Sequence, residues 1–206
     1  MRIPTIVAGT AALALLAGCG DSGGTTGTPT TATTPTSNSS GGGDTTANGA
    51  PKVKNPLDVK AFEANPCGMA TPAQVEAFGL PGVTGRVNSG APGASCIWLG
   101  ASAPSKITPS ATLIPGGKGL DAMYQNKDSY AAFEVLPAIQ GYPAIMNLQV
   151  DQRADGNCDV SVGLSDEVAL LVLIVTEKGS PRFADPCGAA TEFANQVITT
   201  IKAGAK

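Results

Sequence analysis

The order of apolar and polar residues in the second half of the chain predicts a series of β-strands. Between residues 158 and 164, apolar side chains occupy every second position, as in a strand with one buried face. Residues 168–175 form an eight-residue apolar run that is far too short to cross a bilayer, so we expect it to be the central buried strand. Four further strands are expected over residues 95–99, 108–114, 133–136 and 144–150.

Helices are predicted where the apolar spacing changes to three or four residues. Residues 71–74 (Thr-Pro-Ala-Gln) combine a capping box with proline at the first helical position, so a short helix should follow and end at Gly79. A second helix is expected over residues 120–127. The last helix carries apolar side chains at four-residue steps: Phe193, Val197 and Ile201. Because the strands follow one another through short turns, the pattern predicts a single α+β domain, a mainly antiparallel sheet with helices packed on one face.

The start of the chain has the organisation of an export signal. Arg2 precedes an apolar stretch of about 15 residues, whereas a membrane-spanning helix needs about 20, so a secretory signal is favoured. The stretch ends in Leu16, Ala17, Gly18 and Cys19. This ending resembles the lipobox of bacterial lipoproteins, which implies a signal peptide over residues 1–18 and a diacylglycerol on the Cys19 sulfur. An ordinary signal peptide with an incidental cysteine is the alternative.

Two acyl chains hold a protein stably on a membrane without spanning it. The expected location is therefore the extracytoplasmic face of the cell membrane, with the protein lipid-anchored there. In residues 20–50, 24 of 31 residues are Thr, Gly, Ser or Pro, so we expect residues 19–50 to be the lipidated cysteine and a disordered tether. Its Thr-Pro pairs leave open whether the tether is a bare spacer or glycosylated. The folded domain is expected over residues 51–206.

Charge and composition exclude several classes of function. The chain has 13 Lys and Arg against 16 Asp and Glu, for a net charge of −3, so it lacks the basic surface of a nucleic-acid-binding protein. It contains no histidine, which excludes Ser-His-Asp and Cys-His catalysis and histidine-ligated zinc. The sequence gives no reason to expect a cofactor.

Five cysteines leave four for the exported domain once Cys19 is lipidated. Four cysteines allow three pairings. We favour Cys67–Cys96 and Cys158–Cys187, because each pair would join the start of a helix to a strand and would form in an oxidising compartment. A redox or metal site is the alternative, but no Cys-x-x-Cys spacing is present.

Several short motifs together resemble a known family. They are Asn-Pro-Cys-Gly at residues 65–68, Cys-Ile-Trp at 96–98, Gly-Tyr-Pro-Ala at 141–144 and Asp-Pro-Cys at 185–187. The pattern is similar to a family of actinobacterial lipoproteins, the domain of unknown function 3558. The resemblance implies an exported, lipid-anchored domain and brings no known reaction and no catalytic residues.

One acidic segment is a candidate for cation binding. Asp155, Asn157 and Asp159 place oxygen ligands at alternate positions, but the segment lacks the order of a calcium-binding EF-hand. Asp-Gly-Asn at residues 155–157 is also typical of a tight turn, which we favour. No metal site is therefore predicted.

Other candidate chemistry also has a simpler structural interpretation. The glycine-rich segment 116–119 and Ser165 fit turns better than a phosphate loop or a catalytic nucleophile. Trp98 fits a core position beside a disulfide better than a sugar-stacking platform. A glycosidase would need two carboxylates in a cleft, whereas we expect the available ones to lie in exposed turns: Asp151, Asp155, Asp159, Asp166 and Glu167.

The sequence thus predicts a non-enzymatic binding or interaction domain of the cell envelope. Its partners would be the membrane, through the lipid anchor, and an unidentified envelope protein. A small-ligand binder for a lipid or envelope metabolite is the first alternative. A histidine-free hydrolase of cell-wall glycans is the second. Nucleic acid is not an expected partner.

Overall fold

The fold is known from a computed structural model, which describes residues 44–204. The predicted signal peptide, the lipobox with Cys19 and residues 20–43 of the predicted tether lie outside the described residues.

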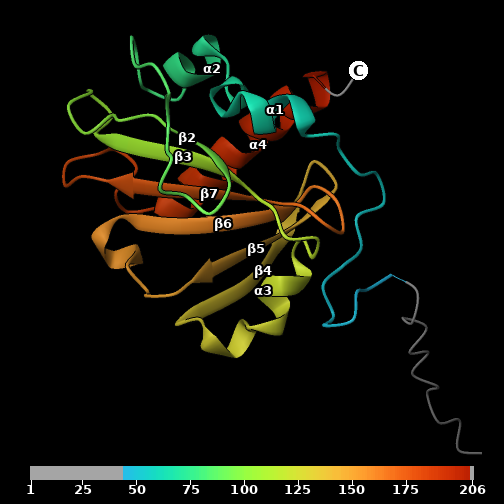
Figure 1. The fold of residues 1–206 in the computed structure, drawn as a ribbon. Helices are drawn as coiled ribbons and strands as arrows, with labels where there is room; N and C mark the ends of the chain where they lie inside the picture. The colour runs from blue at the N-terminus through green and yellow to red at the C-terminus, as the bar shows by residue number, and fades with distance from the viewer. Residues whose placement is uncertain (1–43, 205–206) are drawn as a thin grey trace, which may run out of the picture. The chain divides into compact units, whose positions relative to one another are not determined.

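The six predicted strands and one unpredicted short strand, β1, form one antiparallel sheet (Figure 1). Its strands are β1 (Arg86–Val87), β2 (Ala94–Ile97), β3 (Ile107–Ile114), β4 (Ala132–Ile139), β5 (Tyr142–Leu148), β6 (Asn157–Gly163) and β7 (Ala169–Thr176). The order across the sheet is β1-β2-β3-β7-β6-β5-β4. The apolar run in β7 is central, as predicted, because it pairs along its whole length with β3 and over seven residues with β6.

The helices are α1 (Lys60–Ala64), α2 (Pro72–Ala77), α3 (Asp121–Gln125) and α4 (Pro186–Gly204), with 3-10 turns at η1 (Pro66–Met69), η2 (Lys127–Ser129) and η3 (Arg153–Asp155). The predicted capping box is present at α2: the Thr71 hydroxyl accepts from the Gln74 amide, and the Gln74 side chain accepts from the Thr71 amide. Within residues 44–204, no helix is long and apolar enough to cross a membrane.

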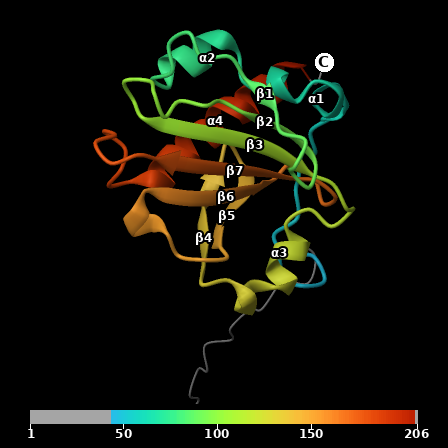
Figure 2. The same ribbon diagram turned by 60° about the vertical axis from the view of Figure 1, so that its left-hand side comes forward.

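The long helix α4 covers one face of the sheet and forms the main core there. Phe193, Val197 and Ile201 are fully buried, and they belong to the same apolar cluster as Val172 and Ile174 of β7. In Figures 1 and 2, α1 and α2 lie on this same side of the sheet. The predicted α+β class, with a mainly antiparallel sheet and helices on one face, is confirmed.

The short helix α3 is the exception, because it lies against the other face. Leu120, just before α3, packs with Ile145 and Ala169. These two side chains alternate with Ala144 and Leu170, which belong to the core under α4. Helix α3 therefore closes one end of the second face and leaves the other end free.

Both predicted disulfides are confirmed. Cys67–Cys96 ties η1 to β2, and Cys158–Cys187 ties β6 to the first turn of α4, with a sequence separation of 29 in each case. Each bond therefore joins the beginning of a helical segment to the sheet, as predicted.

The packed part of the chain includes residues 44–50, which were assigned to the tether, so packing begins a few residues before the predicted start of the domain at residue 51. Ala50 is only 1% exposed and packs near Leu120. The Asp121 carboxylate accepts hydrogen bonds from the Thr46 hydroxyl and from the amide of Asn48. These hydrogen bonds, the Thr46 bond foremost, hold the pKa of Asp121 below its usual value. The composition of residues 44–50 resembles that of the tether. Their packing depends on a few contacts with residues far along the chain, such as Asp121 and Leu120, which composition does not reveal.

Candidate functional site

The sheet face opposite α4 carries an unusual number of buried polar side chains. Seven polar residues are buried in the described part of the chain, and five of these lie on this face: Ser95, Ser110, Thr112, Asn147 and Ser161. Each alternates with apolar residues that point toward α4. We call this surface the polar face and include in it Asn157, Asp159, Leu171, Leu173 and Val175.

The strand registers place these side chains in rows across the sheet. Asp159 of β6 lies opposite Leu173 of β7, which in turn lies opposite Ser110 of β3. In the next row on one side, Asn157 lies opposite Val175. The middle of the face is thus an apolar stripe from β7 bordered by polar groups from β3 and β6.

Some polar groups on this face have partners and others do not. The hydroxyls of Ser95 and Thr112 lie 2.7 Å apart and hydrogen-bond across β2 and β3. By contrast, Asn147 Oδ1, Asn157 Oδ1 and Ser161 Oγ are buried and find no partner within residues 44–204. An unpaired buried polar group costs about 1–3 kcal/mol. Asn147 and Ser161 are buried, whereas Asn157 is partly exposed, so a bound molecule would restore a hydrogen bond at Asn157.

Asp159 is the acidic group of this face. Its carboxylate is largely buried, and this burial raises the pKa of Asp159 to about 6. No hydrogen bond or positive charge within the described residues opposes the shift. Strongly perturbed carboxyl groups of this kind cluster at functional sites.

A pocket of about 210 Å³ lies beside Asp159. It occupies the place where β5 and β6 separate, beyond their last pair, Met146 and Val160. Asp159 is the only charged residue in its lining, which consists of Leu148, Gln149, Val150, Gln152, Asn157, Cys158, Asp159, Leu173 and Val175. The pocket is therefore negative in character, with apolar walls.

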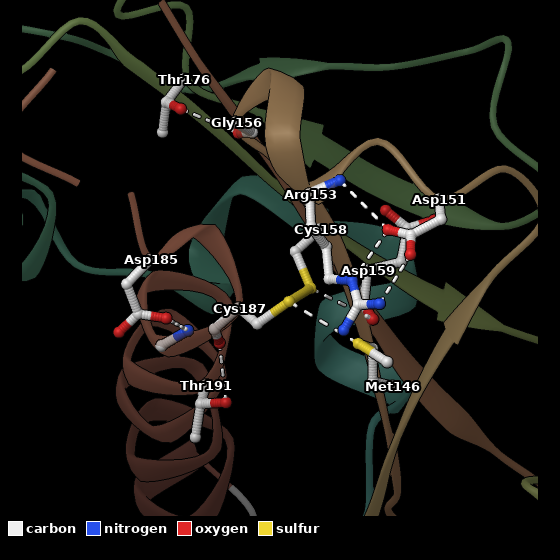
Figure 3. The surroundings of a disulfide bond; sticks show 11 residues. Met146, Asp151, Arg153, Gly156, Cys158, Asp159, Thr176, Asp185, Cys187 and Thr191 are labelled. Atoms are coloured by element: carbon white, nitrogen blue, oxygen red, sulfur yellow. Dashed lines mark hydrogen bonds and ion pairs between the residues drawn. A yellow bond between two sulfur atoms is a disulfide. The ribbon is translucent and has the colours of Figure 1, made fainter. Parts of the chain in front are cut away.

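The strand that carries Asp159 is fixed to α4 (Figure 3). The neighbouring Cys158 is joined to Cys187, whose sulfur lies 3.7 Å from the sulfur of Met146. Arg153 precedes this strand, but its guanidinium pairs with the Asp151 carboxylate at 2.6 Å. The hydrogen bonds from Arg153 lower the pKa of Asp151 to about 2. Asp151 thus engages the arginine, and Asp159 stays without a counter-charge.

The three candidate cation ligands do not come together. Asn157 and Asp159 line the pocket, whereas Asp155 is exposed and lines a separate hollow with Lys106 and Phe183. In the described part of the chain, no group of three or more His, Cys, Asp or Glu side chains is arranged to hold a metal ion. The predicted turn is present at Gly156, which has a φ of 83°. A side chain does not fit there, since a Cβ would lie 2.2 Å from Thr176 Oγ1.

The expectation that all five candidate carboxylates lie in exposed turns is wrong for Asp159, which belongs to β6. Asp159 alternates with Cys158 and Val160 along the strand and therefore lies on the face away from α4. No local sequence signal predicted the pocket beside it. Asp166 does lie in a turn, where it accepts a hydrogen bond from the Val53 amide at 2.8 Å. Asp151, Asp155 and Glu167 are exposed outside the strands.

The remaining candidates have the structural roles favoured above. The Ser165 hydroxyl accepts hydrogen bonds from the amides of Glu167 and Val168 in the turn between β6 and β7. Trp98 is 2% exposed and packs edge-on against Phe193, with 5.3 Å between ring centroids. Asn147 and Ser161 were not recognised from the sequence as residues of this face. The available signal was that each is a polar residue inside a mostly apolar strand.

Comparison with known proteins identifies a family and nothing more specific. No curated protein and no solved structure matches the chain. A family model described as "Protein of unknown function (DUF3558)" matches residues 14–200, nearly the whole chain, in agreement with the motifs around Cys67, Trp98 and Cys187. The chain belongs to the DUF3558 family.

Proposed function

We propose that this protein is an exported lipoprotein, anchored to the extracytoplasmic face of the cell membrane through Cys19, and that its domain binds a partner on the polar face without catalysing a reaction. Two observations support the anchor. The four cysteines of the described part pair with one another, which leaves Cys19 as the remaining thiol. The family match begins at residue 14 and so includes the lipobox.

The binding role rests on one observation: an unpaired acceptor and an unopposed carboxylate line the same pocket on the polar face. Asn157 Oδ1 is buried without a partner, and the Asp159 carboxylate is largely buried without a counter-charge. Both lie at the end of the face that α3 leaves free. Buried polar groups without partners lower the stability of the folded protein. Such groups are usually retained because they are needed for function, here the binding of a ligand.

The pocket also favours binding over glycan hydrolysis. A glycosidase places two carboxyl groups on either side of the scissile bond. Asp159 is the single carboxylate among the residues that line this pocket. The pocket is smaller than the roughly 300–1,000 Å³ of most drug-sized ligand sites, which favours a small ligand or one group of a larger one.

Replacement of Cys19 tests the anchor. In the proposed lipoprotein, Cys19→Ser removes the acylated sulfur, so the chain should no longer incorporate labelled fatty acid and should lose its partition into detergent. Intact mass spectrometry of the purified wild-type chain should show a mature N-terminus at Cys19 with two or more acyl groups. Ser22→Ala is the matched control and should leave acylation unchanged. A mature wild-type chain with an unmodified Cys19 would refute the anchor.

A further inference from the structure

We propose that the pocket at Asp159 binds a small molecule through a primary alkylammonium group, an inference that rests on the binding function proposed above. The ammonium group would pair with the Asp159 carboxylate, and its alkyl chain would lie along the apolar walls of the pocket. Nothing in the family match assigns this ligand class.

Two polar groups of the pocket, at Asn157 and Asp159, are matched to a donor. The Asn157 side-chain amide donates through Nδ2 to Gln152 Oε1 at 3.3 Å, which leaves Oδ1 as its unused atom. That atom is an acceptor, and so is the carboxylate of Asp159 two residues further on. An ammonium group carries three donors and no acceptor, so it satisfies such a pair without leaving a group of its own unpaired.

The charge of the pocket selects a cation. No Lys or Arg is among its lining residues, and Asp159 is the only charged one. The nearest arginine along the chain, Arg153, is held by Asp151 through two hydrogen bonds of 2.8 and 2.6 Å. An anionic ligand would meet an unopposed carboxylate, whereas a cation would supply the missing counter-charge. Hydrogen bonds between charged groups are also roughly twice as strong as neutral ones.

The size and walls of the pocket limit the rest of the ligand. A volume of about 210 Å³ equals the space of about seven liquid water molecules. Leu148, Leu173 and Val175 provide apolar contacts for methylene groups. The pocket therefore suits an ammonium on a short, unbranched chain, and n-pentylamine is a fitting probe.

Calorimetric titration of the purified full chain at about pH 7.5, where Asp159 is mostly ionised, tests the inference. Three probes of equal length differ in charge: n-pentylamine, n-pentanol and pentanoate. We expect n-pentylamine to bind with a Kd in the millimolar range or below, and the other two to bind at least tenfold more weakly. Asp159→Asn, which keeps the shape of the side chain, should weaken pentylamine binding at least tenfold. Asp155→Asn, an exposed control four residues away, should not change it.

Three results would overturn the inference. The first is no binding of pentylamine at tens of millimolar, and the second is pentylamine binding that Asp159→Asn leaves unchanged. The third is equal binding of pentanol, which would indicate a site for neutral hydroxyl groups. Circular dichroism of both variants verifies that they are folded. None of these results bears on acylation of Cys19, or on whether a larger partner can be crosslinked to the polar face in living cells, so failure of the amine inference is distinguishable from failure of the proposed function.

Discussion

Removal of both disulfides is expected to unfold the domain. Each bond closes a loop between cysteines 29 residues apart, and the chain-entropy model assigns about 3.5 kcal/mol to a loop of that length. Loss of both bonds should therefore cost about 7 kcal/mol, whereas single domains have a total stability of about 5–15 kcal/mol. Because the two loops have equal length, each bond should restrict the unfolded chain by the same amount. Any difference between the two losses of stability therefore reports on packing around each bond in the folded state.

Urea unfolding of paired Cys→Ala variants measures these costs. Alanine is the appropriate replacement because Cys96 and Cys158 are 0% exposed, and a serine hydroxyl there would be buried. We expect each pair of substitutions to lower the free energy of unfolding by about 3–4 kcal/mol. The Cys158–Cys187 variant should also loosen the strand that carries Asp159. A loss below about 1 kcal/mol for either bond would contradict its structural role.

Asp159→Asn is expected to stabilise the protein at neutral pH. Burial raises the pKa of Asp159 to about 6 in the folded state, against 3.8 for the ordinary residue. Below pH 3.8 the group is neutral in both the folded and the unfolded state. Between pH 3.8 and 6 the unfolded state loses this proton while the folded state keeps it, so stability falls by about 3 kcal/mol across this window and levels off above pH 6, where the folded state also buries the charge. The asparagine variant does not carry this cost, so its advantage should grow between pH 4 and pH 7.

Unfolding free energies of the wild type and of Asp159→Asn, measured from pH 4 to pH 8, give this difference directly. The pKa of Asp151 is shifted in the opposite direction, so its contribution is lost at low pH, and it cancels when the two proteins are compared. Asp155→Asn, the same substitution at an exposed residue four positions away, is the matched control. A constant difference between wild type and Asp159→Asn across this range would show that the Asp159 pKa is not raised.

The strands and the pairing of the cysteines could be predicted because both leave local signals. Alternation between Cys158 and Leu164 follows from the two-residue repeat of a strand. The observed bonds were favoured because each pair joins a predicted helix start to a predicted strand. The capping box at Thr71 was recognisable for the same reason, since both of its hydrogen bonds join residues three apart.

The polar face could not be predicted because it depends on distant segments. Ser110, Asp159 and Leu173 come from three strands and become neighbours only through the sheet registers. The pocket exists because β5 and β6 separate after Met146, a feature without a local sequence signal. The docking of Thr46 on Asp121 likewise joins residues 75 positions apart. Asp159 lies within the predicted strand 158–164, but its role in a site was not recognised, because alternation does not distinguish an exposed face from a partly covered one.

Photo-crosslinking in living cells tests most directly whether the anchored protein binds its partner at the Asp159 pocket. A photoreactive amino acid at Gln149, an exposed residue of the pocket lining, is compared with the same amino acid at exposed Lys60 on α1. Intact mass spectrometry then detects any adduct, whether a small molecule or a protein. We predict one defined adduct from position 149, its loss when Asp159→Asn is added, and none from position 60. Adducts of equal yield from both positions, or an adduct from position 149 that persists in Asp159→Asn, would contradict the proposed site.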